Sequence, residues 1–275
     1  MSVGSYYIAI VQYAGDTTYS LNISASSVNL PPGFDPNYGY GLVNAAAAVA
    51  SALGLPTFAD VPDRGGNDWG LDMVRAPEVW NQGYTGQGVV VAVIDTGVDY
   101  NHVDLSSNIW MNAGEIAGDG IDNDNNGFID DVRGWDFVDT DNDPMDLEGH
   151  GTHVSGTIAG VNNGFGVTGV AYNSTIMPVR VLGPNGGTAA GVAAGIVYAV
   201  NNGADVINLS LGGGFSTEIR DAIEYAFNQG VVVVMAAGNE GQSQPGFPAR
   251  HATDWGIAVG AVDITNRMAD FSNRA

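Results

Sequence analysis

Three polar residues stand where they could act together in acid–base chemistry. Asp95 follows an apolar run in Val-Ile-Asp-Thr-Gly, and His150 lies between two glycines in Gly-His-Gly-Thr-His-Val. An imidazole is suited to accept a proton near neutral pH, and a glycine-flanked turn allows close approach to a substrate. Asn239, in Ala-Ala-Gly-Asn-Glu-Gly, could aim its amide N–H at a developing oxyanion. These residue types predict a general base and an oxyanion donor.

The same residues allow other interpretations. Asp-Thr-Gly at Asp95 also occurs in aspartic proteases, which need two carboxylates that share a proton. No second Asp-Thr-Gly or Asp-Ser-Gly is present, so that interpretation would require a homodimer. His150 and His153 lack the glutamate and the spacing of a two-histidine zinc helix. Taken singly, Asp95 could be a helix cap and Asn239 a turn residue.

The acidic residues are unevenly distributed. The net charge is −22, so nucleic acid and anionic membranes are not expected partners. Twelve of the 30 acidic residues lie between Glu115 and Glu148, where Arg133 is the single basic residue. Such a cluster repels itself unless cations neutralise it, which indicates bound metal. The chain has no cysteine, which excludes disulfides, thiolate zinc sites and cysteine nucleophiles.

Apolar runs that alternate with helical periodicity must position these residues. Continuous apolar runs at 89–94, 206–211 and 231–236 are typical of parallel strands buried on both faces. Helical periodicity covers 189–201 and 217–228. The predicted fold is therefore α/β, a doubly wound parallel sheet with helices on both faces. Ligands of such sheets bind beyond the carboxyl ends of the strands. A nucleotide-binding domain is excluded because no Gly-x-Gly-x-x-Gly follows the first run.

Composition along the chain indicates an N-terminal appendage. Short β-rich runs at 6–12 and 19–25 predict a hairpin, and two strands alone are marginally stable in water. An alanine-rich helix is predicted over 42–53. The expected zones are the tail of a β-rich module (1–30), a linker with the alanine-rich helix (31–59) and the main domain (60–275).

Four motifs in order make the chain resemble the subtilase family of serine endopeptidases. They are Val-Ile-Asp-Thr-Gly-Val-Asp, Gly-His-Gly-Thr-His-Val, Asn-Leu-Ser-Leu-Gly-Gly and Ala-Ala-Gly-Asn-Glu-Gly. The resemblance covers about residues 66–275. It implies that Asp95 supports His150, that His150 is the general base and that Asn239 is the oxyanion donor. Polypeptides are the implied substrates.

This sequence differs from the family pattern at the nucleophile. Its motif Gly-Thr-Ser-Met-Ala is missing from the 275 residues, and Ser155, Ser210 and Ser272 fall at positions that the family uses otherwise. We expect the serine to lie outside this sequence, which would leave the polypeptide itself inactive. The alternative is a catalytically inactive, calcium-binding pseudopeptidase or binding module. Residues 39–46 resemble the helix that closes the subtilase domain after the serine.

The resemblance also implies a substrate-binding strand and a specificity pocket. Ser210, Leu211 and Gly212 would pair with the substrate backbone. The other pocket residues would be the small Ala236, Gly238 and Gly246. Their size predicts a preference for Phe, Tyr, Leu or Met before the cleaved bond. Glu240 would lie at the rim.

Calcium is the expected cofactor at three loops. The first resembles half of an EF-hand, with oxygen ligands at alternate positions and Arg133 where the closing glutamate would stand, so Asp130 or Asp131 must close the site. The other two follow from the family resemblance. The predicted ligands are Asp122, Asp124, Asn126, Phe128 and Asp131 in the first loop, Asp136, Asp139, Asp141 and Asp143 in the second, and Asp104, Val161, Asn163, Phe165 and Val167 in the third.

The expected setting is an extracellular or periplasmic monomer. No signal peptide and no apolar run of membrane-spanning length is visible. Large secreted enzymes can be held by calcium in place of disulfides, so the missing cysteines do not exclude secretion.

Overall fold

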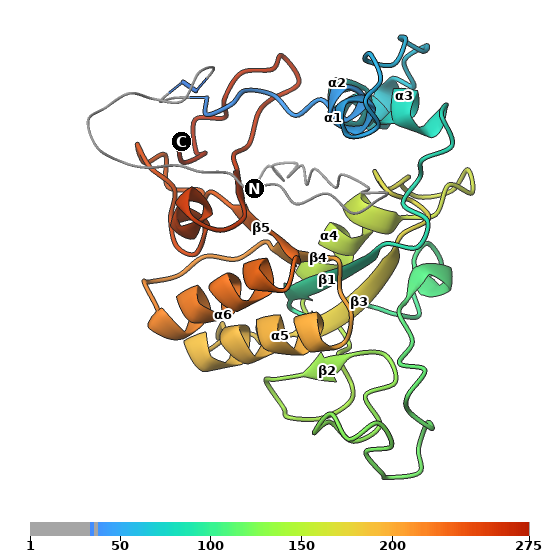
Figure 1. Cartoon of the computed structure of the whole chain (residues 1–275), viewed down its shortest axis with the longest axis vertical. Helices are drawn as coiled ribbons and strands as arrows, with labels where there is room; N and C mark the ends of the chain where they lie inside the picture. Colours follow the sequence, from blue (N-terminus) through green and yellow to red (C-terminus); the bar gives the residue numbers. More distant parts are fainter. Residues whose placement is uncertain (1–33, 36–37, 275) are drawn as a thin grey trace.

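The computed structural model describes residues 34–35 and 38–274 of the chain (Figure 1). The predicted hairpin runs at 6–12 and 19–25 lie outside the described residues. Among the described residues, no helix is long and apolar enough to cross a membrane.

One sheet of six parallel strands forms the centre of the domain, in the order β2-β3-β1-β4-β5-β6. Strand β1 lies between β3 and β4, and its register pairs Val93 with both Pro178 and Asn208. The carboxyl ends of β1, β4 and β5 therefore lie at the same edge of the sheet. The strands are β1 (Val90–Asp95), β2 (Trp135–Asp136), β3 (Thr175–Arg180), β4 (Val206–Leu209), β5 (Val232–Ala236) and β6 (Ile257–Val259).

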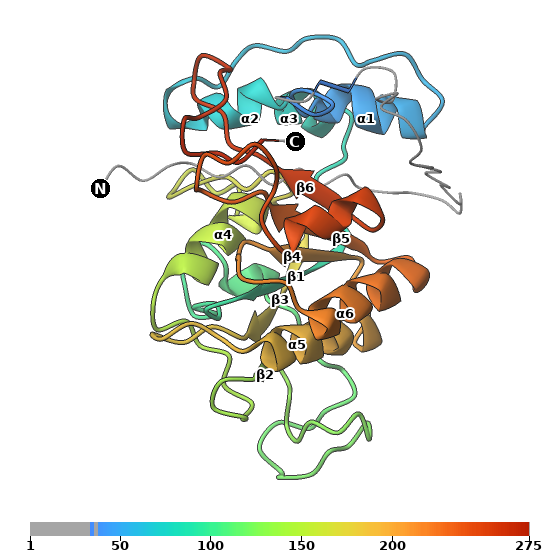
Figure 2. The ribbon, with the colours of Figure 1, turned by 90° about the vertical axis from the view of Figure 1, so that its left-hand side faces the viewer.

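Helices cover both faces of the sheet, as Figure 2 shows with α4 on one side and α5 and α6 on the other. The α-helices are α1 (Ala45–Ala52), α2 (Trp69–Met73), α3 (Ala76–Trp80), α4 (His150–Ala159), α5 (Ala189–Asn201) and α6 (Thr217–Asn228). Short 3₁₀ turns are η1 (Gly66–Asp68), η2 (Ser106–Asn108) and η3 (Ala249–Thr253). The predicted helices at 189–201 and 217–228 and the doubly wound fold are confirmed.

Alternate residues of β1 face opposite layers of the core. Val91 and Val93 pack in the cluster that contains Ile158 of α4. Ala92 and Ile94 pack in the cluster that contains Ile196 of α5. Both faces are buried, which is why the strand reads as one continuous apolar run.

Some predicted bounds differ from the structure. The strand predicted over 206–211 ends at Leu209, so Ser210 and Leu211 lie in the loop that follows β4. The alanine-rich helix begins at Ala45 because the Asn44 side chain accepts a hydrogen bond from the Ala47 amide, which makes Asn44 the N-cap. Strands β3 and β6 were not anticipated, since β3 contains a proline and β6 has three residues.

Helix α1 packs on the main domain. The Ala45 amide donates to the Val74 carbonyl at 2.8 Å, and Ala46 and Ala50 pack in one cluster with Val79 of α3. The alanine-rich segment thus shares a core with residues beyond 60, across the boundary that the composition indicates.

Candidate active site

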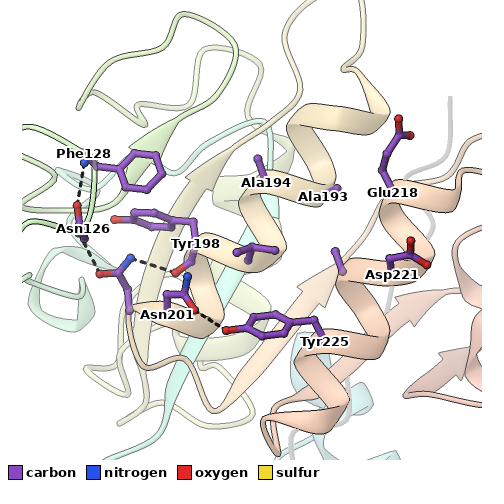
Figure 3. A pocket seen from close by; sticks show the side chains of 12 residues that line it. Asn126, Phe128, Ala193, Ala194, Tyr198, Asn201, Glu218, Asp221 and Tyr225 are labelled. Atoms are coloured by element: carbon purple, nitrogen blue, oxygen red, sulfur yellow. Dashed lines mark hydrogen bonds between the residues drawn. The ribbon is translucent and has the colours of Figure 1, made fainter.

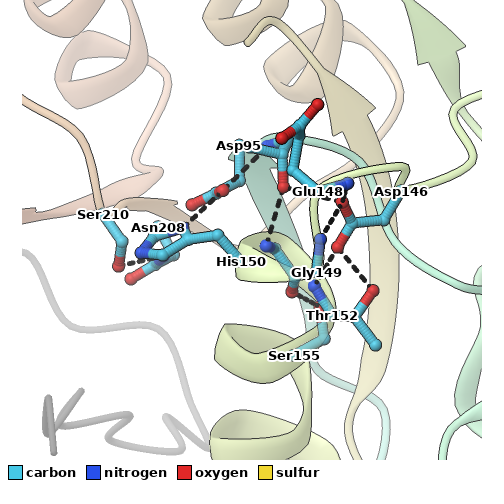
Figure 4. Close-up of polar contacts among 11 residues, drawn as sticks. Asp95, Asp146, Glu148, Gly149, His150, Thr152, Ser155, Asn208 and Ser210 are labelled. Atoms are coloured by element: carbon cyan, nitrogen blue, oxygen red, sulfur yellow. Dashed lines mark hydrogen bonds and ion pairs between the residues drawn. The ribbon is translucent and has the colours of Figure 1, made fainter. Parts of the chain in front are cut away.

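Asp95 and His150 meet at the carboxyl edge of the sheet. The Asp95 side chain is wholly buried at the end of β1, and its Oδ1 lies 2.7 Å from His150 Nδ1 at the first residue of α4 (Figure 4). The Thr96 amide also donates to Asp95 Oδ1, at 2.7 Å. The half-exposed imidazole therefore has one nitrogen fixed by a carboxylate while its other nitrogen remains able to exchange a proton.

Glycines bring the two elements close enough for this contact. Gly149 caps α4 with φ 92°, a left-handed conformation that favours glycine. A Cβ on Gly151 would lie 2.0 Å from the Gly97 carbonyl oxygen, so the helix could not approach the end of β1 with any other residue there. The close approach expected of the glycines around His150 is thus built into the backbone.

The surroundings favour the charged form of His150. Its pKa is raised chiefly by the hydrogen bond to Asp95, with smaller contributions from the charges of Asp95 and Asp146, while burial opposes the shift. Because the folded state holds the proton more tightly than the unfolded chain, protonation of His150 stabilises the fold.

The free energy of unfolding should therefore depend on pH through the protonation of His150. The contribution of the pair is fully present below the ordinary imidazole pKa and is lost as pH rises through the raised folded-state pKa of His150. Urea unfolding at pH values on both sides of this window should show the loss. The variant His150→Gln should not show it, and an equal pH dependence in both proteins would contradict the assignment.

The pairing of Val93 with Asn208 is the last one between β1 and β4, and Ser210 follows two residues later, at the same edge of the sheet as Asp95. The buried Asn208 side chain donates from Nδ2 to Ser210 Oγ at 3.0 Å (Figure 4). Ser155 and Ser272 are buried, and their hydroxyls donate to the carbonyls of Gly151 and Asn273. These bonds agree with excluding both as nucleophiles.

The three predicted pocket segments converge. The Gly213 amide donates to the Phe247 carbonyl at 2.9 Å, and the Gly246 amide donates to the Ala237 carbonyl at 2.8 Å. These bonds tie the segment after β4, through Ser210, Leu211 and Gly212, to the segment after β5 and to Gly246.

The glycines of the predicted pocket differ in their surroundings. A Cβ on Gly246 would meet nothing nearer than the Ala237 oxygen at 3.6 Å, and a Cβ on Gly212 would lie 3.7 Å from the Phe247 oxygen. Neither has positive φ, so at these two positions glycine leaves space. Gly238 has φ 111° and would place a Cβ 2.4 Å from Asn273 Nδ2, so there glycine serves the backbone.

Asn239 lies in a loop after β5, and the Asn273 side chain is hydrogen-bonded to the backbone of this loop. The buried Asn273 side chain accepts from the Glu240 and Gln242 amides at 3.2 and 2.8 Å and donates to the Ala237 carbonyl at 3.0 Å. Glu240 is turned back into this loop, where its Oε2 accepts from the Asn239 amide at 3.0 Å. The Glu240 side chain is nevertheless exposed, so its place at the rim stays a prediction. Asn273 went unnoticed because a short polar residue near a chain end carries no pattern.

The first acidic loop gathers carboxylates in a different set from the one predicted. Oxygens of Glu115, Asp124 and Asp131 all lie within 4.8 Å of one another. Glu115 was missed because it lies outside the alternating motif. Asp122 is not in this group, and its carboxylate accepts from the Asn126 and Gly127 amides at 3.1 and 2.9 Å. The donors are hard oxygens, which fit calcium.

Asp131 is the buried member of this carboxylate group. Burial raises the pKa of Asp131, and hydrogen bonds from Tyr198, Asn112 and Asn126 oppose the shift. The Asn126 amide group donates to Asp131 Oδ2 at 3.1 Å, and Phe128 packs edge-on against Tyr198. A bound cation would favour the ionised carboxylate.

The loop at 161–167 wraps the carboxylate of Asp104. This carboxylate is buried, and it accepts from Asn163 Nδ2 at 3.0 Å and from the Val167 amide at 2.9 Å. Asn163 Oδ1 accepts from the Phe165 amide, and the Val161 amide donates to the Asp104 carbonyl at 3.0 Å. The structure therefore brings together the predicted residues of this loop.

The remaining acidic loop is partly neutralised by the protein. Arg180 Nη1 pairs with Asp136 and with Asp139, the latter at 2.6 Å. Asp143 accepts from the Tyr100 hydroxyl at 2.7 Å, and Asp141 accepts from the Asp143 amide at 3.0 Å. In the described part of the chain these four carboxylates do not form one convergent group.

A separate cavity of about 600 Å³ lies between α5 and α6 (Figure 3). It is lined by Ala193, Ala194 and Tyr225, whose hydroxyl donates to Asn201 Oδ1 at 2.8 Å. Helices α5 and α6 cover the face of the sheet opposite α4, the helix that begins with His150 (Figure 2). The cavity is not part of the Asp95–His150 site.

Residues 86–275 match the sequence profile of the subtilase family. The chain belongs to the subtilase family. Its relatives include the thermophilic serine proteinase of Bacillus sp. (strain AK1), 43% identical over 76% of this chain and 47% of the relative. Thermitase of Thermoactinomyces vulgaris is 41% identical over 74% of this chain and 65% of its own length. A solved cold-adapted subtilisin-like serine proteinase superposes with a TM-score of 0.55 and 36% identity, covering 69% of this chain and 60% of that chain.

This subtilase chain spans about half of the first of these relatives and less than two thirds of the second. The family assignment and the doubly wound fold rest on the shared region, which contains Asp95, His150 and Asn239.

Proposed function

We propose that the chain supplies the acid–base and oxyanion parts of a serine endopeptidase. The observation that carries the proposal is the 2.7 Å contact between the wholly buried Asp95 carboxylate and His150 Nδ1. Membership of the subtilase family supports the reaction class. The nucleophilic serine is proposed to come from a Gly-Thr-Ser-Met-Ala stretch outside these 275 residues.

Each residue has a defined role in this reaction. The serine Oγ attacks the peptide carbonyl carbon while His150 Nε2 takes the hydroxyl proton, and Asp95 stabilises the imidazolium that forms. The Asn239 amide donates to the oxyanion of the tetrahedral intermediate. His150 then gives its proton to the leaving amine, and water repeats the sequence to release the acyl group.

The substrate is proposed to be an extended polypeptide. Leu209 ends β4, so the following Ser210, Leu211 and Gly212 are free to pair with a substrate backbone as an added strand. A Cβ on Gly246 would make only ordinary van der Waals contacts, and this room supports a large apolar side chain before the cleaved bond.

The proposed function can be tested by measuring which residues precede the cleaved bond. In the longer, serine-containing protein, a peptide library should show cleavage after Phe, Tyr, Leu or Met. Because each buried methylene contributes about 0.8 kcal/mol, Gly246→Val should reduce cleavage after Phe about 10–200-fold.

Cleavage after Ala is the internal control in the same variant, since a methyl group does not need the filled space. Strong preference for Asp or Glu would show that the pocket assignment is wrong. No cleavage of any peptide by the serine-containing protein would contradict the function itself and favour a calcium-binding pseudopeptidase.

Calcium is proposed to stabilise the fold without taking part in the chemistry. Glu115, Asp124 and Asp131 would hold one ion, with Asn126 and the Phe128 carbonyl nearby. Asp104 and Asn163 would hold a second ion with loop carbonyls. The carboxylates paired with Arg180 would have to share their charge with any ion. Calcium is abundant outside cells, and we propose an extracellular or periplasmic monomer.

A further inference from the structure

Asp146, a residue without a sequence motif, accepts hydrogen bonds from both sides of the active site. Its Oδ1 accepts from the Thr96 hydroxyl at 2.9 Å and from the Glu148 and Gly149 amides at 2.9 and 2.8 Å. Its Oδ2 accepts from the Thr152 amide at 2.9 Å and from the Thr152 hydroxyl at 2.6 Å. One carboxylate thus satisfies donors from the loop after β1 and from the first turn of α4 (Figure 4).

These bonds close a ring around the Asp95–His150 contact. Thr96 donates its hydroxyl to Asp146, and the same oxygen accepts from the Gly151 amide at 2.9 Å. The Thr96 amide donates to Asp95. The residues next to Asp95 and next to His150 are therefore fixed to each other through Asp146.

We propose that Asp146 is a positioning residue for His150: it locks the first turn of α4 to the loop after β1 and so holds the imidazole against Asp95. The inference rests on the proposed function, in which His150 is the base. Asp146 does not touch the reacting atoms, and its effect passes through the orientation of His150.

The charges around His150 give this role an electrostatic component. Asp95 from β1 and Asp146 from the preceding loop both act on the imidazole, with Asp95 dominant. Glu148, two residues before His150, is exposed, and Arg180 of β3 is held by two carboxylates of its own. Burial raises the pKa of Asp146, but the bonds from Thr152, Gly149 and Glu148 outweigh it and lower that pKa. Asp146 therefore stays ionised where His150 titrates.

The test uses this 275-residue chain and proton NMR of its four histidines, with His150→Gln to assign the His150 signals. In the unaltered protein the Nδ1 proton bonded to Asp95 should give a slowly exchanging, far-downfield signal. Asp146→Asn should remove or broaden that signal and move the titration midpoint of His150 to lower pH. Thr152→Val keeps the charge of Asp146 and removes one of its donors, together with the acceptor of the Asp99 amide. It should therefore broaden the signal with a smaller shift of the midpoint.

Asp263→Asn is the matched control, since Asp263 also accepts from a threonine amide, the hydroxyl of that threonine and a further amide. It should leave both His150 readouts unchanged even if the melting temperature falls. An unchanged Nδ1 signal and midpoint in folded Asp146→Asn would overturn the proposal. If Asp146→Asn fails to fold, an unchanged His150 signal in Thr152→Val would overturn it. Because no hydrolysis is measured, this failure is distinguishable from a failure of the proposed function.

Discussion

Replacing His150 by alanine in a chain that continues through the serine is expected to lower kcat about 10⁶-fold, which is the loss that the same change causes in subtilisin, a relative of this chain. The physical reason is that a serine hydroxyl is a weak nucleophile until a base removes its proton. The imidazole held 2.7 Å from Asp95 is the base that the site provides. The measurement is steady-state hydrolysis of a chromogenic peptide with Phe before the reporter group.

His153 provides the matched control for this substitution. It lies on the same helix, three residues further along, and is exposed. His153→Ala should keep near-normal turnover. The 275-residue polypeptide should show no hydrolysis, because the nucleophile motif is missing from it. Hydrolysis by that polypeptide, abolished by His150→Ala in the same preparation, would refute the division of roles proposed above.

Removal of calcium is expected to lower the melting temperature of this chain. One site with free calcium at 100 times its dissociation constant contributes about 2.7 kcal/mol, which corresponds to about 5–10 °C for a domain of this size. The reason is the convergence of Glu115, Asp124 and Asp131, whose mutual repulsion a divalent ion would cancel. Thermal unfolding followed by circular dichroism, with calcium and with a chelator, measures the difference.

Two substitutions in the same loop separate a metal site from a general charge effect. Asp124→Asn removes one converging carboxylate and should shrink the calcium-dependent shift. Asp119→Asn removes an exposed carboxylate outside the converging group, and the shift should stay. A midpoint that does not respond to the chelator would count against calcium at all the proposed loops.

The amino-acid sequence was enough to locate the chemistry-bearing residues and the layers that hold them. Strand β1 is buried on both faces, so its residues form an unbroken apolar run that ends at Asp95. His150 and Asn239 could be found because each lies in a glycine-bounded motif in the order typical of subtilases. Parallel strands place their carboxyl ends at one edge, which let the site be located before its geometry was known.

The support of these residues became visible only in the packed structure. Asp146 is bound to Thr96, 50 positions away, and Asn273 to Ala237, 36 positions away. Neither bond leaves a periodic or local pattern. The same holds for Glu115, which joins the acidic loop from outside its motif, and for Glu240, whose carboxylate accepts from the distant Asn273 side chain. Hydrogen-bond partners and converging charges depend on distances that exist only after the loops have packed, because a short polar side chain can bind any donor within reach.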